Sequence, residues 1–457
     1  MKDHADKGQG GEGQRASGEN LSRRGFVKSL AAAGAGIAAP AVVPASALGG
    51  NGEVPPSERI TIGAIGLDGR GKTDLKHFLT KKDVQCAAVC DCFKKRRQQA
   101  LKIVKRRQDR GKCKAYRFHE KVLERDDIDA VVLATGTRWH TVLSCLAAQA
   151  GKDVYCEKPF CLTVGEGREL VNTMKRYGTV WQCGTQRRSN ASYQSVVEMV
   201  HRGDIGELQT IKTFLGGAWK QNGLAKPQPS PDPATFDYER WLGQSPWAPY
   251  SPVRVRLWRM NWDTGGGVVP DMGAHYFDLA QWAHDRELTG PVEYEGSAQW
   301  PDHGFSEVPQ TVDVRARYED GVEIHITNGP DGPKLPGAPG YLQGKAVRFI
   351  GDAGQIQIDE RSVIRTKPQS LRQRAVGGKS WSYMAGHVRN FLDCIKSRRR
   401  TNSYPELAQR GHTIAHCTNI CLRLGRTLEW DYENEEFVDD REANNLLKRT
   451  RRAPWRI

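Results

Sequence analysis

Residues 59–67 form an apolar stretch that runs directly into a glycine-rich turn, Gly66 to Gly71. Further apolar stretches of strand length follow at residues 84–91, 130–135, 153–156 and 180–183. Helical stretches separate them. Strands that alternate with helices at this spacing indicate a parallel sheet with helices on both faces. We therefore expect a doubly wound α/β domain over residues 59–183.

The turn has the spacing of a phosphate-binding site. In a strand–turn–helix unit, glycines let the backbone approach a pyrophosphate, which lies at the helix N-terminus. Gly66, Gly69 and Gly71 supply such glycines, and Arg70 lies among them. Asp68 takes the place of the usual second glycine, where a side chain and a negative charge oppose phosphate binding. Either Gly69 assumes that role, or cofactor affinity is weakened, or the turn binds nothing.

Asp91 ends the second strand, 20 residues after the last glycine of the turn. A carboxylate at this place can accept hydrogen bonds from the adenosine ribose hydroxyls, which favours NAD. A basic run, residues 94–97, follows closely and can pair with a 2′-phosphate, so NADP stays open. Asp91 and the turn residues, Asp68 included, are the first predicted cofactor contacts.

Two polar stretches follow strands at the edge where such sheets bind ligands. Thr135, Trp139 and His140 belong to the first, after the strand at 130–135, and we expect them on the cofactor side. Glu157 and Lys158 begin the second and are further predicted cofactor contacts, ahead of a proline that holds the lysine extended or in a cis peptide. A lysine there can donate to a substrate oxygen. The plainer interpretation is a surface lysine in an ion pair.

Residues 265–285 read as a helix with two distinct faces. Asp271, His275, Asp278 and Trp282 share one face, because they recur every three or four residues. Apolar residues form a second stripe that would seat the helix on a sheet. A carboxylate beside an imidazole suits proton transfer. The alternative is a surface helix with a capping aspartate and a hydrogen-bonded histidine.

Strand patterns dominate the chain after residue 183. They fall at residues 208–215, 292–300, 311–318, 322–328, 345–351 and 355–359. Such a run of strands indicates a large, mainly antiparallel sheet in a second, α+β domain, residues 184–430. Helical patterns return at residues 384–396 and 405–424, and the polar tail, residues 431–457, is expected to pack back on the body.

The N-terminus has the order of an export signal. Paired arginines, Arg23 and Arg24, precede an apolar run at residues 30–43 and an A-x-A-like cleavage site that ends at Ala47. This order predicts a twin-arginine leader over residues 1–47, a linker at 48–58 and a periplasmic protein without a stable membrane anchor. The alternative is a basic N-terminus ahead of an Ala-rich anchor.

Charge and cysteine content restrict the partners. The formal net charge is +15, but the basic runs are short and scattered, which favours solvated faces over a nucleic-acid groove. An attraction to acidic substrates or surfaces stays open. No pair among the eleven cysteines has zinc-finger spacing, and we predict no metal site. Their apolar surroundings indicate thiols of a chain that folded in a reducing compartment.

Taken together, these stretches resemble the Gfo/Idh/MocA family, named after glucose–fructose oxidoreductase, inositol dehydrogenase and a rhizopine-catabolism protein. The resemblance runs from about residue 59 to the C-terminus and rests on GAIGLDGRG, VCD, ATGTRWH, CEKPF, CGTQRRS and PDMGAHYFDLAQW. The leader and the closing EANNLLKRTRRAPW resemble an exported branch. Gly136 and Thr137 depart from the family pattern on the cofactor side, as Asp68 does.

The resemblance implies a Rossmann domain followed by a domain whose open sheet mediates homodimers or homotetramers. It puts the family's lysine on Lys158 and its aspartate and histidine on Asp271 and His275, above a nicotinamide. The implied reaction is oxidation of a secondary hydroxyl of a sugar, glycoside or cyclitol. We expect Arg188, Trp258 and Arg259 to contact that substrate together with His275.

The predicted export bears on how the cofactor is bound, because a periplasm offers no obvious NAD pool. We therefore expect the cofactor to stay tightly bound through turnover. A retained cofactor also allows a glycosidase or lyase reaction through a transient keto-sugar. The third reading is a non-catalytic sugar-binding protein with a degenerate nucleotide site, for which Asp68 is the best support.

Overall fold

The computed structural model describes residues 54–108, 113–217, 223–329, 332, 344–376 and 383–455. The chain divides into two units, Met1–Pro55 and Pro56–Ile457, and all the helices and strands given below belong to the second. The predicted leader, residues 1–47, lies outside the described residues.

The first sheet is a parallel, six-stranded sheet with strand order β3-β2-β1-β4-β5-β6. Its strands are β1 (Ile60–Ile65), β2 (Val84–Cys90), β3 (Lys114–Tyr116), β4 (Ala130–Leu133), β5 (Asp153–Cys156) and β6 (Trp181–Cys183). All residues of β1 are buried, as expected for a central strand covered on both faces. The predicted parallel α/β domain is confirmed. The edge strand β3 was not predicted, because its three residues carry no apolar run.

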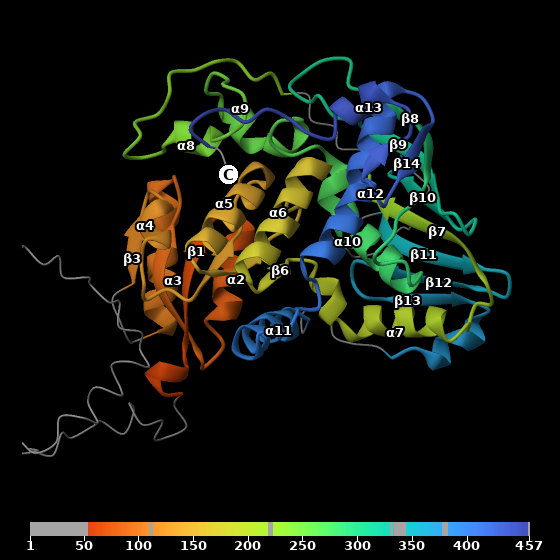
Figure 1. Cartoon of the computed structure of the whole chain (residues 1–457), viewed down its shortest axis with the longest axis horizontal. Coiled ribbons are helices and arrows are strands. Elements are labelled where there is room, and N and C mark those ends of the chain that lie inside the picture. Colours follow the sequence, from red (N-terminus) through yellow and green to blue (C-terminus); the bar gives the residue numbers. More distant parts are fainter. Residues whose placement is uncertain are drawn as a thin grey trace, which may run out of the picture. The chain divides into compact units, whose positions relative to one another are not determined.

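Helices cover both faces of this sheet (Figure 1). They are α2 (Gly69–Phe78), α3 (Lys94–Arg107), α4 (Glu120–Leu123), α5 (Thr137–Gln149) and α6 (Val164–Tyr177). A helix from the far end of the chain, α11 (Tyr383–Ser397), also packs here, where Phe391 meets Phe78 of α2 edge to face at 6.1 Å between ring centroids. The first domain therefore takes part of its core from the second half of the sequence.

The second sheet has nine strands in the order β13-β12-β11-β7-β10-β9-β8-β14-β15. They are β7 (Leu208–Leu215), β8 (Glu293–Gln299), β9 (Thr311–Arg317), β10 (Glu323–Thr327), β11 (Lys345–Gly351), β12 (Gln355–Asp359), β13 (Ile364–Lys367), β14 (Leu428–Asp431) and β15 (Glu436–Phe437). The pair β7–β10 is parallel and its neighbours in the sheet are antiparallel. The predicted mainly antiparallel sheet is confirmed, and β13, β14 and β15 extend it beyond the predicted strands.

Helices cover one face of this second sheet. They are α7 (Ala191–His201), α10 (Val268–Ala283) and α12 (Pro405–Leu424). The predicted apolar stripe of α10 is buried and includes Tyr276, which is fully covered. Residues of β9 alternate between buried and exposed, so the opposite face of the sheet is open. This packing fixes the orientation of α10 and of the polar residues on its other side.

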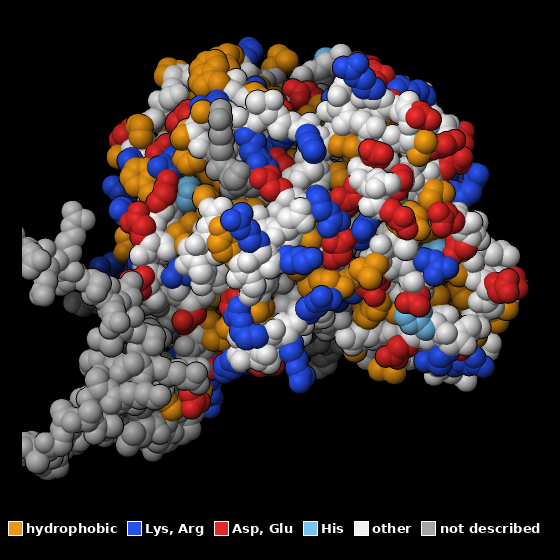
Figure 2. Space-filling model, viewed as in Figure 1, with side chains coloured by type: hydrophobic (Ala, Val, Ile, Leu, Met, Phe, Trp, Pro, Cys, Tyr) orange, Lys and Arg blue, Asp and Glu red, His pale blue; other side chains and the backbone are white. Residues whose placement is uncertain are grey.

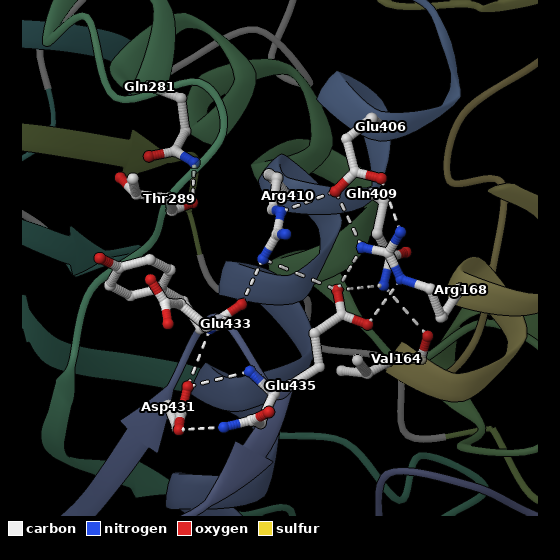
Figure 3. Close-up of polar contacts among 12 residues, drawn as sticks. Val164, Arg168, Gln281, Thr289, Glu406, Gln409, Arg410, Asp431, Glu433 and Glu435 are labelled. Carbon is white, nitrogen blue, oxygen red and sulfur yellow. Dashed lines mark hydrogen bonds and ion pairs between the residues drawn. The ribbon is translucent and has the colours of Figure 1, made fainter.

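A half-buried ionic network ties α6 of the first domain to α12 and to the tail (Figure 3). Arg168 of α6 lies between two carboxylates, with Nη1 2.6 Å from Glu406 Oε2 and Nη2 2.8 Å from Glu435 Oε1. Arg410 of α12 donates to the same Glu406 at 2.8 Å. The fork geometry of a guanidinium makes such bidentate contacts directional, which fixes α6 against α12.

The basic tail packs back on the body, as expected. After α13 (Arg441–Asn445), Arg449 pairs with Glu166 and Arg451 with Glu169, both carboxylates of α6. Trp455 then meets Trp139 of α5 edge to face, with ring centroids 4.9 Å apart. Elsewhere, Lys and Arg side chains are interspersed with Asp and Glu over the face drawn in Figure 2. Within the described ranges, no helix is long and apolar enough to cross a membrane.

Candidate functional site

The turn after β1 is packed so closely that only glycine fits at two positions. Gly66 has φ +86°, and a Cβ there would lie 2.6 Å from the carbonyl carbon of Ala134. A Cβ on Gly71 would lie 1.9 Å from the carbonyl oxygen of Gly66. A Cβ on Gly69, by contrast, would meet nothing within 4 Å. Helix α2 begins at Gly69, so its first N–H groups are available to an anion.

A cavity of about 650 Å³ lies in front of this turn. Its floor is the glycine turn with the ends of β2 and β4, and its opposite wall comes from residues 236–259 in the second half of the chain. Ligand sites of small molecules and cofactors have this size and occur at this edge of α/β sheets. The turn, the helix end and the cavity together fit a dinucleotide.

The opposite wall consists of α8 (Tyr238–Leu242), α9 (Pro252–Arg256) and the 3-10 turn η5 (Trp258–Met260). In Figure 1, α8 and α9 lie above α5. Phe236 anchors this segment, because its ring stacks on Phe93 at 3.7 Å between centroids. Backbone bonds join the same two segments, including Lys94 N–H to the carbonyl of Thr235 at 2.9 Å. The wall is thus held by the residues that follow β2.

Asp68 does not leave an unpaired negative charge at the turn. Its side chain is 64% exposed and lies 2.6 Å from Arg96 Nη2. Asp91 is buried and accepts hydrogen bonds from the N–H groups of Leu67 and Phe93 at 2.7 and 2.8 Å. Burial raises the pKa of the Asp91 carboxyl above its ordinary value, although Arg96 and these two bonds oppose the rise. Its oxygens keep lone pairs for a ribose hydroxyl.

Lys158 and Asp271 meet although 113 residues separate them. Lys158 Nζ donates to the backbone oxygen of Asp271 at 2.6 Å and to its Oδ1 at 3.3 Å. Arg259 Nε donates to the same Oδ1 at 3.2 Å. Burial opposes ionisation of Asp271, but these two cations outweigh it and hold the pKa of the carboxyl well below its usual range. Because Arg259 also lines the cavity, it connects the cavity with this pair.

His275 lies one turn after Asp271 on α10 and is 9% exposed. Its Nδ1 is buried and has no hydrogen-bond partner within the described part of the chain. Burial, reinforced by the positive charges of Arg187 and Lys158, holds the pKa of the imidazole well below its ordinary value. His275 is therefore neutral at pH 7, which is the form that accepts a proton.

Two other buried histidines hold the segment that carries Lys158. The Lys158–Pro159 peptide is cis, and His140 Nδ1 lies 2.6 Å from the carbonyl oxygen of Pro159. Phe160 N–H donates to His412 Nε2 at 3.4 Å, while His412 Nδ1 lies 2.7 Å from the carbonyl of Ala408. The bond from Phe160 requires a neutral His412 ring, because only an unprotonated Nε2 can accept it, whereas His140 donates its Nδ1–H to the carbonyl. His140 thus supports the Lys158 segment and is not among the residues that line the cavity.

The other predicted cofactor residues fall into two groups. Thr135 and Trp139 line the cavity, as do residues 66–70 of the glycine turn, whereas Gly71 does not. Arg70 also lines it, but its Nε donates to Glu157 Oε1 at 2.9 Å, so Glu157 is engaged in an ion pair beneath the site. Glu157 does not line the cavity and supports the wall by holding Arg70.

Some of the predicted substrate contacts line the cavity and others do not. Trp258 and Arg259 line the cavity, and the Arg259 guanidinium lies over the Trp258 ring at 4.3 Å. Arg188 lies elsewhere: it is 6% exposed and pairs with Asp278 at 2.8 Å and with Glu287 at 2.7 Å. Its charge is satisfied by these carboxylates, and it fixes α10 rather than reaching the cavity.

Several site residues were missed from the sequence. They include Arg138, which lines the cavity, and Lys345, a buried lysine whose charge acts on Asp271. Phe236, Trp241 and Tyr250 of the opposite wall were missed too. Arg138 stands inside the stretch that was already singled out after β4, so its position was a usable signal. The wall carries no such signal, because its distance from the turn in sequence is large.

The thiols and acidic groups give no metal site among the described residues. All eleven cysteines are free, and most are buried. Within the same ranges, no group of three or more His, Cys, Asp or Glu side chains is arranged to hold a metal ion. Lys158, Asp271 and His275 do not line the cavity themselves; Arg259, which does, joins the cavity to them through its bond to Asp271.

Comparison with protein families covers nearly the whole chain. A model described as "Oxidoreductase family, NAD-binding Rossmann fold" matches residues 60–185. A second, described as "Oxidoreductase family, C-terminal alpha/beta domain", matches residues 190–457. The two matches meet between the parallel and the mainly antiparallel sheet.

Among curated proteins, a glycosyl hydrolase family 109 protein of Shewanella pealeana is 31% identical over 207 residues, 41% of this chain and 44% of that protein. The chain thus spans about half the length of such relatives, or less. Among solved structures, an aldose-aldose oxidoreductase of Caulobacter crescentus has a TM-score of 0.59 at 16% identity, covering 81% of this chain and 99% of that one. A putative myo-inositol dehydrogenase of Sinorhizobium meliloti has a TM-score of 0.57 at 18% identity, with the same coverage. At such identity, these structures show the fold.

Proposed function

The chain belongs to the Gfo/Idh/MocA oxidoreductase family, and on that premise we propose that it is an NAD(P)-dependent oxidoreductase acting on a secondary hydroxyl of a sugar, glycoside or cyclitol. The observation that carries the proposal is the contact of Lys158 with Asp271, beside a neutral His275 and joined through Arg259 to a cavity of dinucleotide size. NAD is favoured by Asp91, and NADP stays open because Arg96 lies close by.

The glycine turn and Asp91 would hold the dinucleotide, whose nicotinamide would supply the acceptor for the hydride on the carbon that carries the hydroxyl. His275 takes the hydroxyl proton, for which its neutral imidazole is the competent form. The atoms balance: the alcohol loses a hydride and a proton and becomes a ketone. Positioned acid–base catalysis contributes about 10²–10⁴-fold, so loss of His275 is expected to cost that much in turnover.

Lys158 donates a hydrogen bond to the oxygen that becomes negative as the proton leaves. Its ammonium already lies in a largely buried setting, where such a donor acts more strongly than in water. Asp271 pairs with the ammonium and holds it in place, and Arg259 shares that carboxylate. Trp258 offers an apolar face against which a sugar ring can stack.

A specific observation favours a second function in the same site. The curated relatives are named glycosyl hydrolase family 109, and the match covers 41% of this chain. In that alternative, oxidation at one carbon would acidify a neighbouring C–H bond. Loss of that proton would eliminate the glycosidic oxygen and leave an unsaturated ketone. Water would then add to the double bond, and the hydride would be given back to the ketone. Net hydrolysis results, and the cofactor is regenerated on the protein. A vacant sugar-binding module is less favoured, because Arg96 pairs with Asp68 and offsets its negative charge at the turn.

Three further features belong to this proposal. The leader over residues 1–47 would export the folded chain by the twin-arginine route to the periplasm. A cofactor in that compartment would have to stay bound through turnover. The open face of the nine-stranded sheet would mediate a homodimer or homotetramer.

A screen of glycosides, free sugars and cyclitols on the cofactor-loaded protein tests these functions. Net reduction read at the nicotinamide absorbance supports the oxidoreductase, whereas sugar release without net reduction supports the glycosidase. The His275→Ala variant should bind cofactor normally and lose about 10²–10⁴-fold in either rate. If His275→Ala turns over as fast as the parent chain, the assigned role of His275 is wrong.

A further inference from the structure

Among the residues that the structure describes, no carboxylate forms an ion pair with the positive charge of Arg138. The side chain is 2% exposed and belongs to the first turn of α5. Its Nε donates to the backbone oxygen of Trp241 at 2.8 Å, and the guanidinium lies 4.0 Å above the Trp241 ring. Nη1 is buried without a hydrogen-bond partner among the residues that the structure describes. Burial accordingly lowers the pKa of the guanidinium below its ordinary value.

Most other arginines of the same cavity are neutralised by acidic side chains. The pairs are Arg70 with Glu157, Arg96 with Asp68, Arg117 with Asp237, Arg240 with Glu120 and Arg259 with Asp271. Arg138 is more deeply buried than these and has no ion pair within the described part of the chain. A buried charge without a partner is costly, so a fold that retains one favours the arrival of an anion.

The position of Arg138 identifies the anion that can arrive. It lines the same cavity as the glycine turn. A Cβ on Gly136 would lie 2.5 Å from Arg138 Nη1, so the loop after β4 passes close to the guanidinium. The same loop touches the turn, since a Cβ on Gly66 would lie 2.6 Å from Ala134. The guanidinium and the N-terminus of α2 therefore serve one ligand space.

We propose that Arg138 binds a phosphate group of the dinucleotide, as a fixed cation in the cavity wall that offsets the loss of the second glycine at Asp68. The inference rests on the proposed function, because it takes the ligand to be NAD or NADP. Phosphate oxygens complete the hydrogen bonding of a guanidinium in its planar fork geometry. The phosphate is either the pyrophosphate that both cofactors share or the 2′-phosphate of NADP.

The test compares Arg138→Met and Arg138→Lys with Arg315→Met, a control that removes an equal charge from a residue outside the cavity lining, one that is paired with Glu323. Protein stripped of nucleotide is titrated calorimetrically with NAD, NADP, ADP, adenosine and inorganic pyrophosphate, and its melting temperature is recorded. We expect Arg138→Met to weaken NAD and ADP about 10- to 100-fold and to leave adenosine unchanged. Arg138→Lys should recover part of the loss, and Arg315→Met should bind like the parent chain.

Stability separates this role from a structural one. Without ligand, Arg138→Met should melt at or above the temperature of the parent chain, because a buried unpaired charge has been removed. A lower melting temperature together with unchanged NAD affinity would make Arg138 structural and overturn the proposal. A loss for NADP that exceeds the loss for NAD assigns the 2′-phosphate, and equal losses assign the pyrophosphate.

The outcomes also distinguish the inference from the proposed function. If the parent chain binds pyrophosphate in an Arg138-dependent way but neither dinucleotide, the phosphate site stands and the cofactor proposal fails. If both dinucleotides bind equally to the parent chain and to Arg138→Met, the cofactor proposal stands and the inference fails. Binding of none of the probes overturns both.

Discussion

Acid should loosen the segment that carries Lys158, because His412 must stay neutral to hold it. His412 Nε2 accepts the N–H of Phe160, so protonation of that nitrogen removes the acceptor and sets two donors against each other. Burial lowers the pKa of His412 to about 3. An unfolded chain has the ordinary histidine pKa of about 6.5. The stability that a neutral His412 contributes is therefore fully present above pH 6.5 and is lost as the pH falls toward 3.

The size of the effect follows from these two values. Linkage gives about 1.4 kcal/mol per pH unit for one proton taken up by the unfolded chain only. Between pH 7 and pH 5, His412 alone should lower the free energy of unfolding by about 2 kcal/mol. His140, whose pKa burial lowers to about 4, should add a loss of similar size.

Urea-induced unfolding at pH 7 and pH 5 measures this loss. The variant His412→Gln keeps a side-chain acceptor but cannot titrate, so its loss between the two pH values should be smaller than that of the parent chain by about 2 kcal/mol. His303→Gln changes an exposed histidine and should leave the parent loss unchanged. Equal losses in His412→Gln and the parent chain would refute this assignment of the neutral ring.

Three further predictions follow from the packing and the site. Gly71→Ala should lower the melting temperature, because its Cβ would lie 1.9 Å from a backbone oxygen. Gly69→Ala should be tolerated, because its Cβ would meet nothing within 4 Å. Equal melting temperatures of the two variants would contradict the close packing of the turn. Trp455→Ala should lower the free energy of unfolding by about 1–3 kcal/mol, because it loses the edge-to-face contact with Trp139. Trp455→Phe should recover part of that loss. Unaltered stability in Trp455→Ala would mean that the tail is not docked. Lys158→Met should lower turnover about 10²–10³-fold and retain NAD affinity. Steady-state kinetics and calorimetry measure these two quantities. Normal turnover would show that Lys158 takes no part in the reaction.

The sequence was most informative where a pattern is local. Alternating apolar stretches predicted the parallel sheet, and the spacing within 265–285 predicted both faces of α10. The short edge strands β3 and β15 were not predicted, because they have only three and two residues and carry no apolar run. A periodicity needs several residues on one face before it differs from chance.

Contacts between distant segments could not be derived from local patterns. Nothing in residues 383–397 indicates that α11 packs on α2, and nothing near Trp241 indicates that it covers the cavity. The meeting of Lys158 with Asp271 was expected from the family resemblance and not from spacing. Arg188 shows the converse: its residue type suited a substrate contact, but its buried pairs with Asp278 and Glu287 appear only in three dimensions.

The most direct test is the nucleotide content of the protein itself. Purified full-length chain is denatured, and the supernatant is assayed enzymatically for NAD and NADP; stripped protein is then titrated with each. We expect about one equivalent of dinucleotide per chain, either carried through purification or restored on titration, with lower affinity in Gly71→Ala. Protein that carries neither dinucleotide and binds neither on titration would contradict the central claim that this cavity holds the cofactor beside Lys158 and His275.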